Sequence, residues 1–254
     1  MNWVLDLDGV VWLGDDSVPG AADAVARLQD RGDTVVFVTN NSYLPVGEVE
    51  AKLARHGIEA NAAVVNSAMA AAALVEAGQR VLVCGGPGVV EALGERGAIP
   101  VANDRDPGAP VDMVMVGFHR DFDYERMRRA ATAVRAGARL IATNDDATYP
   151  TPAGPIPGAG SILAGIQRAT GVDAVVAGKP YVPMANLLRA RLSESGTVVG
   201  DRPDTDGRLA RVLGYRFALV LTGVTAVDDV PGVEPKPDIV APDLASLVDA
   251  YIHR

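Results

Sequence analysis

The sequence alternates short apolar runs with amphipathic stretches, and this alternation constrains the fold more than any other feature. The apolar runs are rich in β-branched residues and cover residues 3–11, 34–41, 80–86, 111–118, 138–146, 174–180, 196–206 and 217–224. Helix-like stretches at 19–32, 46–57 and 124–137 each end in a glycine, and Pro19 is expected in the first helical turn. Continuous apolar strands that alternate with helices predict an α/β fold with a parallel sheet covered on both faces.

Composition and charge exclude several classes of protein. The chain has 254 residues and a net charge of −9 without any Lys/Arg-rich run, so we expect no nucleic-acid partner. No apolar run approaches the roughly 18 to 20 residues of a membrane span, and no secretion signal is evident. The single cysteine, Cys84, ends an apolar run and is expected to be a buried packing residue. We expect a cytoplasmic protein.

Two aspartates interrupt the first apolar run. Asp6 and Asp8 are two residues apart, so in a strand their carboxylates would lie on the same face. Neighbouring like charges are unfavourable unless a cation or a catalytic task holds them together. The pair therefore predicts a bound metal ion, although an Asp-x-Asp pair alone is equally compatible with a structural or surface role.

Other predicted strands also end in compact polar clusters. Thr39, Asn40 and Asn41 follow the second run, Lys179 follows a later one, and the last cluster supplies three aspartates: Asp201, Asp204 and Asp206. Ligands of open α/β sheets bind outside the carboxyl ends of the strands, so these clusters should converge on one crevice. Taken singly, the clusters also suit helix caps or acidic loops.

Together, these groups suit the transfer of a phosphoryl group. Aspartates are oxygen ligands of the kind that Mg²⁺ prefers, and Lys179 with Thr39 would hold phosphate oxygens. Of two neighbouring carboxylates, one can attack phosphorus to form an aspartyl-phosphate. The other can protonate the leaving alcohol and then activate water.

At these residues the sequence resembles the haloacid dehalogenase (HAD) superfamily of phosphatases. The segments "DLDGV", "VTNN", "GKP" and "VGDRPDTD" are similar to its four motifs. The longer segments "LDLDGVVWLGDDSVPGA" and "IPGAGSI" resemble the branch that contains para-nitrophenylphosphatases and the glycerol-phosphate and pyridoxal-phosphate phosphatases. The resemblance covers nearly the whole chain. Because Asp8 is present, the resemblance implies a phosphatase and not a dehalogenase.

The resemblance also implies roles for individual residues. Asp6 is expected to be the nucleophile and Asp8 the general acid and base. Mg²⁺ would be held by Asp6, the main-chain carbonyl of Asp8, and Asp201. Both Asp204 and Asp206 could be the second acidic residue of the fourth motif, and we prefer Asp206 in a supporting role. The residues expected to hold the phosphoryl group are Thr39, Asn40, Asn41 and Lys179.

The expected architecture is a doubly wound, Rossmannoid catalytic core interrupted by an inserted α/β cap that selects the substrate. We place the core at residues 1–76 and 176–254 and the cap at 77–175. The segment from Asn41 to Lys179 is far longer than one crossover needs, and it contains strand and helix patterns of its own. Relatives often pair through their caps, which leaves a homodimer open.

Substrate choice is expected to depend on the cap. Tyr149 falls where pyridoxal-phosphate phosphatases have a substrate-contacting histidine, which puts that substrate in doubt. Together with Pro150 and Pro152, the residue would equally serve to stiffen an exposed loop. We expect no catalytic role for His56 at a helix end or for His253, and a structural, interfacial or substrate contact for His119. A sugar or glycerol phosphate is the favoured substrate class.

Two alternatives to a phosphatase differ in class. A signalling receiver module also combines an acidic pair, a phospho-accepting aspartate, a threonine and a lysine around Mg²⁺. Its accepting aspartate, however, ends a middle strand, where this chain has Thr39, Asn40 and Asn41. The second alternative is a scaffold that keeps the fold without turnover. Turnover of para-nitrophenyl phosphate with Mg²⁺ would separate the three.

Overall fold

The computed structural model describes residues 1–149, 151 and 154–253, and these form two compact units. The first unit comprises residues 1–39, 47–65 and 179–254, and the second comprises 40–46 and 66–178. The predicted cap, residues 77–175, lies within the second unit, which also includes residues 66–76, residues 176–178 and the short segment 40–46. The two units are described separately below.

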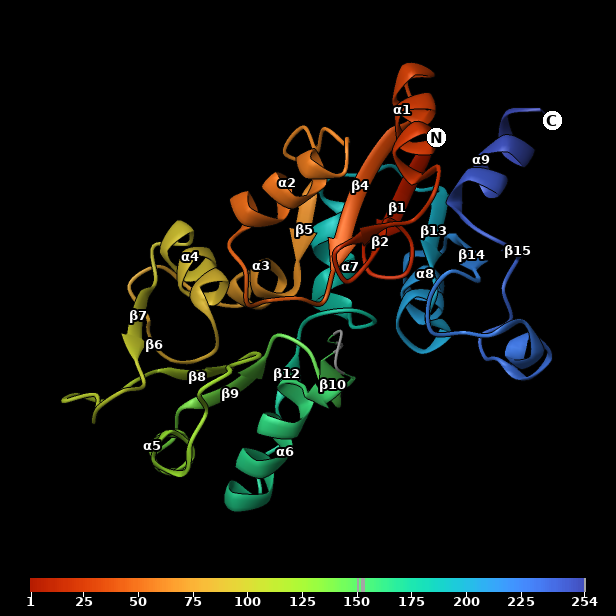
Figure 1. Cartoon of the computed structure of the whole chain (residues 1–254). Helices are drawn as coiled ribbons and strands as arrows, with labels where there is room; N and C mark the ends of the chain where they lie inside the picture. Colours follow the sequence, from red (N-terminus) through yellow and green to blue (C-terminus); the bar gives the residue numbers. More distant parts are fainter. Residues whose placement is uncertain (150, 152–153, 254) are drawn as a thin grey trace. The chain divides into compact units, whose positions relative to one another are not determined.

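The first unit is built on a six-stranded sheet in which β1 is central (Figure 1). The strand order is β15 (Ile239–Ala241), β14 (Arg216–Val220), β13 (Gly196–Gly200), β1 (Asn2–Asp6), β4 (Thr34–Thr39) and β5 (Val64–Asn66). Strand β1 pairs in parallel with both β4 and β13, and β13 to β15 continue the parallel pattern. Strands β4 and β5 lie on one side of β1, and the later strands β13, β14 and β15 lie on the other. The order therefore reverses between β1 and β13, as in a doubly wound sheet.

Helices and short elements complete the first unit. They are α1 (Ala21–Asp30), α2 (Val46–Arg55), α7 (Val182–Arg189), α8 (Arg208–Leu213), α9 (Leu244–Ile252), the hairpin of β2 (Trp12–Leu13) and β3 (Asp16–Ser17), the π-helical turn η1 (Pro203–Gly207) and the 3₁₀ helix η2 (Val227–Gly232). Helix α1 packs on α9, and α7 packs on α8. The prediction for Pro19 is wrong: Gly20 caps α1 in a left-handed conformation, so Pro19 precedes the helix.

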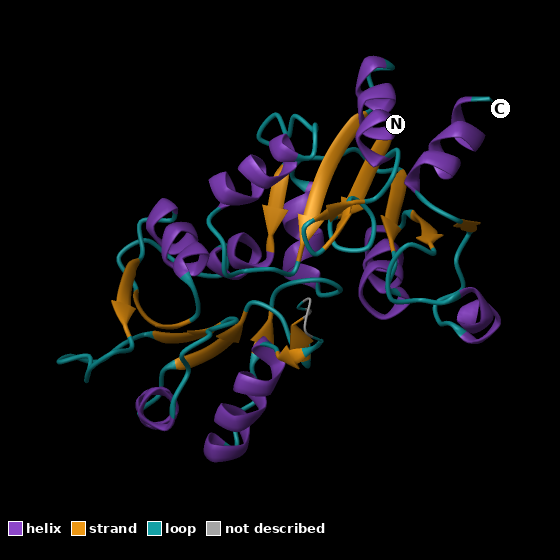
Figure 2. Cartoon of the chain, viewed as in Figure 1, coloured by secondary structure: helices purple, strands orange, loops and turns teal. Residues whose placement is uncertain are grey.

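The second unit has its own parallel sheet of five strands. The order is β12 (Val175–Val176), β9 (Arg139–Ala142), β8 (Met113–Val116), β6 (Arg80–Cys84) and β7 (Ile99–Ala102). Its other elements are α3 (Ser67–Ala72), α4 (Pro87–Glu95), α5 (Tyr124–Arg135), α6 (Ala159–Thr170) and the antiparallel hairpin of β10 (Thr148–Tyr149) and β11 (Ile156–Pro157). Figure 2 shows the strands and helices of both units. This sheet is also parallel throughout.

Burial explains why the strands read as continuous apolar runs. All five residues of β1 and all four of β8 are buried, as expected for strands covered on both faces. Trp3, Phe37 and Phe217 are the largest fully buried side chains of the first sheet, and Met113 and Ile141 are their counterparts in the second. The sequence-based prediction of parallel α/β architecture is confirmed.

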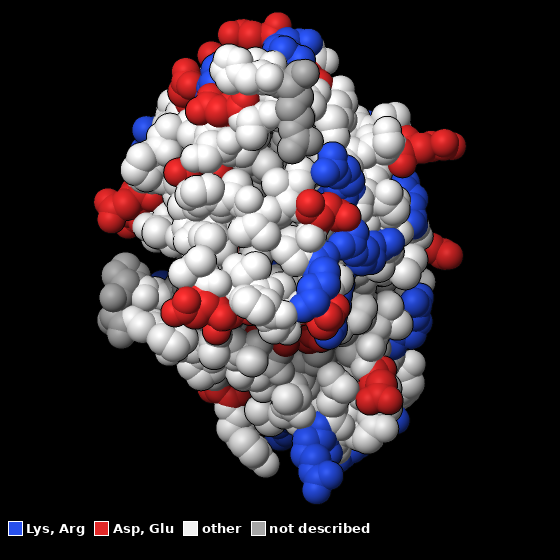
Figure 3. Space-filling view, turned by 90° about the vertical axis from the view of Figure 1, so that its right-hand side faces the viewer, with Lys and Arg blue, Asp and Glu red and all other residues white. Residues whose placement is uncertain are grey.

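The surface carries charges of both signs. On the face in Figure 3, Lys and Arg side chains lie among Asp and Glu side chains and uncharged residues. Several exposed side chains of opposite charge form pairs, such as Arg211 and Asp238 at 2.7 Å. Within the described residues, no helix combines the length and the apolar character that crossing a membrane requires.

Candidate active site

The carboxyl ends of the central strands bring three predicted site residues to the reversal point of the first sheet. Asp6 is the last residue of β1, Thr39 is the last residue of β4, and Asp201 directly follows β13. The strand order reverses between β1 and β13, which is where doubly wound sheets bind their ligands. All three residues are buried. The position of the site thus follows from the order in which the strands pair.

Lys179 lies between two carboxylates. Its Nζ atom is 2.7 Å from Oδ1 of Asp6 and 2.7 Å from Oδ1 of Asp206. Burial by itself lowers the pKa of Lys179, but the carboxylates of Asp206 and Asp6 outweigh this and raise it above its usual value. The two carboxylates thus favour the protonated, positively charged form of Lys179. Asp6 Oδ1 also accepts a hydrogen bond from the backbone N–H of Leu7 at 2.8 Å.

The carboxylates outnumber the positive charge that faces them. Asp6, Asp201 and Asp206 each offer an oxygen atom within 4.8 Å of the others. Burial raises the pKa of Asp6 and of Asp201 to about 6, and that of Asp206 to about 7. Three buried carboxylates beside one ammonium group leave an excess of negative charge that a divalent cation would balance.

One oxygen of Asp201 gives a more specific indication of a metal. Oδ2 accepts a hydrogen bond from the backbone N–H of Val224 at 2.6 Å, whereas Oδ1 is buried and has no hydrogen-bond partner among the described residues. A buried carboxylate oxygen without a donor is costly unless something positive binds it. Oxygen donors of this kind suit Mg²⁺. The residues present therefore fit the predicted metal.

Two glycines that the motif analysis did not single out make room for Asp201. Gly9 has φ +82°, and a Cβ atom there would lie 2.5 Å from Asp201 Oδ2. A Cβ atom on Gly223 would overlap the same oxygen. Thr225 Oγ1 adds a hydrogen bond to the backbone oxygen of Asp201 at 2.6 Å. The sequence signals were present, since Gly9 follows Asp8 and "LTGV" ends a strand run.

Asp8 is not one of the three clustered carboxylates. The residue is exposed, and its Oδ1 atom accepts a hydrogen bond from Nε1 of Trp12 at 3.0 Å. The pKa of Asp8 is raised because surrounding protein atoms displace water from its carboxyl group, and the hydrogen bond from Trp12 offsets only part of this effect. An exposed carboxyl group two residues after Asp6 is suited to exchanging protons with a bound molecule.

Asp204 and Asp206 have different surroundings. Asp206 is fully buried beside Lys179, whereas Asp204 is exposed and pairs with Arg202 at 3.0 Å. Of these two aspartates, the structure thus places only Asp206 in the cluster.

Three other predicted site residues make their contacts within the second unit. Asn40 Nδ2 donates to Asp146 Oδ2 at 3.1 Å, and Asn41 Nδ2 donates to the hydroxyl of Tyr149 at 3.2 Å. The ring of Tyr149 stacks on Phe118 with their centroids 4.4 Å apart. The three predicted residues Asn40, Asn41 and Tyr149 therefore belong to one hydrogen-bonded and aromatic group.

Cys84 and the three histidines, which the sequence also offered as candidates, make contacts typical of structural residues. Cys84 is completely buried, which confirms the expectation of a packing residue. His56 Nδ1 lies 2.5 Å from Ser17 Oγ. His119 Nδ1 accepts the backbone N–H of Asp121, and burial lowers the pKa of its ring. His253 follows α9 as its C-cap.

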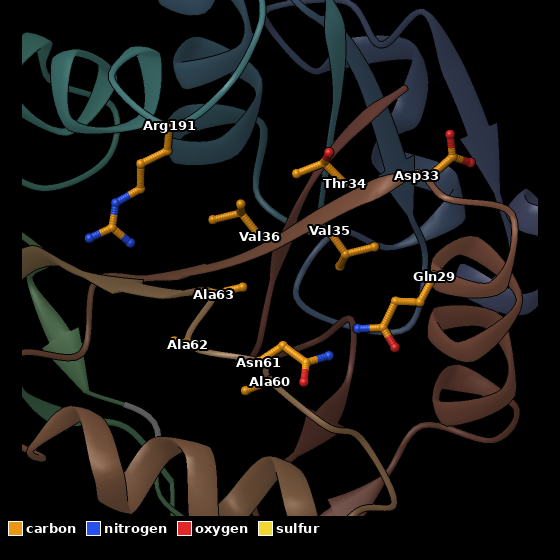
Figure 4. Close-up of a pocket in the computed structure, with 10 residues that line it drawn as sticks. All are labelled: Gln29, Asp33, Thr34, Val35, Val36, Ala60, Asn61, Ala62, Ala63 and Arg191. Carbon is orange, nitrogen blue, oxygen red and sulfur yellow. The ribbon is translucent and has the colours of Figure 1, made fainter.

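A hollow of about 340 Å³ lies at the other end of β4 (Figure 4). Thr34 lines it, and Thr34 begins the strand that Thr39 ends. Asn61 and Arg191 contribute polar side chains. None of the predicted site residues lines this hollow, so it is separate from the carboxylate cluster.

Comparison with known proteins identifies the family. The model of the haloacid dehalogenase-like hydrolases matches residues 3–99, and a HAD-hydrolase-like model matches residues 176–247. A D-glycerol 3-phosphate phosphatase of Mycobacterium tuberculosis is 36% identical over 252 residues, which are 96% of this chain and 70% of that protein. The chain belongs to the haloacid dehalogenase-like hydrolases. The resemblance seen in the four motifs is thereby confirmed.

Another relative and two solved structures also match nearly the whole of this chain. An acid sugar phosphatase of Staphylococcus saprophyticus is 32% identical, covering 97% of this chain and 96% of its own. The crystal structure of a Mycobacterium tuberculosis glycerol phosphate phosphatase in complex with magnesium has a TM-score of 0.89 at 36% identity, covering 97% of this chain and 75% of that one. A 4-nitrophenylphosphatase of Thermotoga maritima has a TM-score of 0.88 at 31% identity, covering 98% and 96%. The predicted fold class is confirmed.

Proposed function

We propose that this protein is a Mg²⁺-dependent phosphatase that hydrolyses small phosphate monoesters through an aspartyl-phosphate, with a sugar or glycerol phosphate as the favoured substrate. The observation that carries the proposal is the buried cluster of Asp6, Asp201, Asp206 and Lys179 at the reversal point of the first sheet. The relatives named as glycerol 3-phosphate and acid sugar phosphatases support the reaction and the substrate class.

The first chemical step transfers the phosphoryl group to the protein. A carboxylate oxygen of Asp6 attacks phosphorus and forms a P–O bond, while the bond between phosphorus and the ester oxygen breaks. The electron pair of that bond leaves on the alcohol oxygen, to which Asp8 donates its proton. Lys179 and the hydroxyl of Thr39 bind the phosphoryl oxygens during the transfer, and we propose that Asn40 and Asn41, which directly follow Thr39, add further donors.

The second step releases phosphate. Asp8, now deprotonated, takes a proton from a water molecule, whose oxygen attacks phosphorus and displaces the carboxylate of Asp6. Asp6 and protonated Asp8 are regenerated, so the two steps together consume one ester and one water. The exposed position of Asp8 allows both the alcohol and the water to reach it.

The metal would be held by Asp6, Asp201 and the main-chain carbonyl of Asp8. Bound there, Mg²⁺ supplies positive charge that offsets the repulsion between a phosphate dianion and the aspartates. Asp206 has a different part: it pairs with Lys179 and keeps that ammonium group beside Asp6. The unpartnered Oδ1 atom of Asp201 is the observation on this chain that supports the metal.

Substrate selection is assigned to the second unit. Tyr149 and Asn41 share a hydrogen bond, and Phe118 supports the tyrosine ring. We propose that Tyr149 contacts the leaving group and not the phosphoryl group. Pairing of two copies through the second unit, and a cytoplasmic location, stay predictions from the sequence.

The test is turnover. The purified protein should release phosphate from para-nitrophenyl phosphate, glycerol 3-phosphate and sugar phosphates when Mg²⁺ is present. A receiver-like module would instead incorporate at most one phosphoryl group per chain from acetyl phosphate, without sustained release. Absence of turnover on every ester, in a folded and Mg²⁺-loaded protein, would refute the proposal.

A further inference from the structure

Trp12 contacts the expected acid and base, and none of the four motifs assigns it a role. Its indole Nε1 atom donates a hydrogen bond to Asp8 Oδ1 at 3.0 Å. Asp8 is exposed, but Trp12 keeps only 3% of its surface exposed. A carboxylate on the surface is thus tied to a side chain in the interior. A hydrogen bond to a charged acceptor is stronger than one between neutral groups.

Two side chains, one in helix α2 and one directly after it, contact the indole ring of Trp12. Lys52 Nζ lies 4.3 Å from the centre of the Trp12 ring, in cation–π contact, and donates a hydrogen bond to the backbone oxygen of Gly14 at 2.6 Å. The ring of His56 lies 5.3 Å from the Trp12 ring, tilted by 32°. His56 also contacts Ser17 Oγ at 2.5 Å, in the strand that pairs with β2. The orientation of Trp12 is therefore fixed by contacts on several sides.

Backbone hydrogen bonds also hold together the segment that contains Asp8 and Trp12. The N–H of Gly9 donates to the carbonyl of Trp12 at 2.7 Å, and the N–H of Trp12 donates to the carbonyl of Leu7 at 3.2 Å. Trp12 pairs with Ser17 across the hairpin of β2 and β3. Asp8 and Trp12 are consequently held in one register, and the indole N–H can restrict the rotation of the Asp8 carboxyl group.

We propose that Trp12 is a positioning residue that orients Asp8 for proton transfer: it holds Oδ1 and thereby directs Oδ2 to the reacting oxygen. This inference rests on the proposed phosphatase function and adds a residue to it. Holding a reacting group in one geometry removes an entropic part of the barrier. The benefit should be greatest where the leaving group needs its proton most, in alkyl esters such as glycerol 3-phosphate.

The second tryptophan provides a matched control. Trp3 is also buried, with 2% of its surface exposed, and its ring packs edge-on against Tyr251 at 5.0 Å. Its Nε1 atom has no hydrogen-bond partner among the described residues. Replacing either tryptophan with phenylalanine keeps an aromatic ring and removes an N–H group. Only at position 12 does that group contact a proposed catalytic residue.

The test compares kcat/KM for two esters. Trp12→Phe should lower kcat/KM for glycerol 3-phosphate by about 10- to 100-fold, because the indole N–H stabilises the negative charge that develops on Asp8 as it gives up its proton. The loss for para-nitrophenyl phosphate should be several times smaller, because p-nitrophenolate leaves without needing a proton. Trp3→Phe should change both values by less than about twofold, since its N–H group makes no such bond. Equal losses for the two esters in Trp12→Phe would overturn the inference.

A double-mutant cycle separates positioning from packing. In the Asp8→Asn background there is no proton to transfer, so adding Trp12→Phe should lower kcat/KM for glycerol 3-phosphate little further. A packing role would instead give the same factor in both backgrounds. If Trp12→Phe fails to fold, Lys52→Met removes the cation over the ring and should show the same ester dependence with a smaller factor; ester-independent behaviour there would overturn the inference as well. A wild-type protein that turns over no ester refutes the phosphatase function itself, which is a separate result.

Discussion

The two parallel sheets of this protein are organised alike, and their carboxyl ends differ in what occupies them. In the first sheet the strand order reverses between β1 and β13, and in the second it reverses between β6 and β8. At the first reversal point lie Asp6 and Asp201, with Lys179 beside Asp6. At the second, the strands are followed by Gly85 and Gly117.

The second reversal point is filled by the chain's own segment 40–46. A Cβ atom on Gly117 would lie 2.8 Å from Ser42 Oγ, and one on Gly86 would overlap Tyr43. Ser42 Oγ accepts a hydrogen bond from Thr143 Oγ1 at 2.9 Å, so the contact is neutral and satisfied. Strand order by itself therefore does not make a ligand site, because the chain's own residues can fill the reversal point. The first reversal point differs in that buried charged side chains and a carboxylate oxygen without a hydrogen-bond partner among the described residues lie there.

Removing the proposed nucleophile should have the largest effect. Asp6→Asn should lower kcat on the order of a thousandfold or more, because an amide neither attacks phosphorus nor binds a cation well. Thr143→Val removes a polar group at the end of the second sheet and should cost about 1 to 3 kcal/mol of stability, the value of the two hydrogen bonds that its hydroxyl makes with Ser42 and Asn144, with little loss of kcat. Steady-state kinetics and thermal unfolding of both variants provide the comparison. Similar losses of kcat in both would show that the two sheet ends do not differ in function.

Metal removal tests the same cluster without a mutation. A chelator should abolish turnover and Mg²⁺ should restore it. Ca²⁺ should fail or inhibit, because it takes more ligands at longer distances. Mg²⁺ should also raise the unfolding temperature of the wild type but not of Asp201→Asn, since ligands that bind only the native state stabilise it. Full activity in a preparation shown to be free of metal would contradict the assignment.

Substitutions of Asp206 and Asp204, the two candidate aspartates of the fourth motif, should differ clearly in their effect on stability. Asp206→Asn removes one partner of a buried ion pair, and such changes cost roughly 3 to 5 kcal/mol of stability. Asp204→Asn removes an exposed pair with Arg202, which is worth about 0 to 1 kcal/mol. Denaturant unfolding of the two variants in chelator measures the difference. Comparable stability of both would mean that the Lys179 pair contributes little to the fold.

Sequence patterns predicted most of the sheets because both-face burial leaves a strong signal. Every strand run proposed from the sequence contains a strand, from β1 to β14. Of the four edge strands of the two parallel sheets, the patterns did not predict β5, β7 and β15. An edge strand pairs with a neighbour on one side only, so its place depends on tertiary pairing, and a local pattern does not contain that information.

The site was predictable where residues are adjacent in sequence and not where they meet through packing. Asp6 and Asp8 are two residues apart, and their motif is visible at once. The contact of Trp12 with Lys52 joins residues 40 positions apart through a cation–π interaction. The link between Asn41 and Tyr149 spans 108 positions. Neither contact has a periodic signal, and both depend on how elements pack.

A moderate effect is expected at Tyr149, and it should depend on the substrate. If Tyr149 contacts the leaving group, Tyr149→Ala should change kcat/KM by factors that differ between esters by about 1 to 3 kcal/mol. Acetyl phosphate, whose leaving group is small, should be nearly unaffected. Tyr149→Phe keeps the stacking on Phe118 and removes only the hydroxyl that Asn41 contacts, so it separates the two contributions. A uniform change across all esters would assign Tyr149 a structural role.

The smallest effect is expected at Cys84, the last residue of β6 in the second sheet. Burial raises the pKa of its thiol to about 12, and Asn103 Nδ2 lies 3.0 Å from its sulfur. Since the thiolate is the reactive form, a raised pKa means that Cys84 stays protonated and unreactive at pH 8. Iodoacetamide should therefore not modify the native protein, whereas it should modify one thiol per chain in denaturant, as mass spectrometry would measure. Cys84→Ala should leave kcat/KM unchanged within about twofold, because the residue contacts no group of the proposed mechanism. Rapid alkylation of the native protein, together with loss of turnover, would place a functional group at the carboxyl end of the second sheet and remove the contrast between the two sheets.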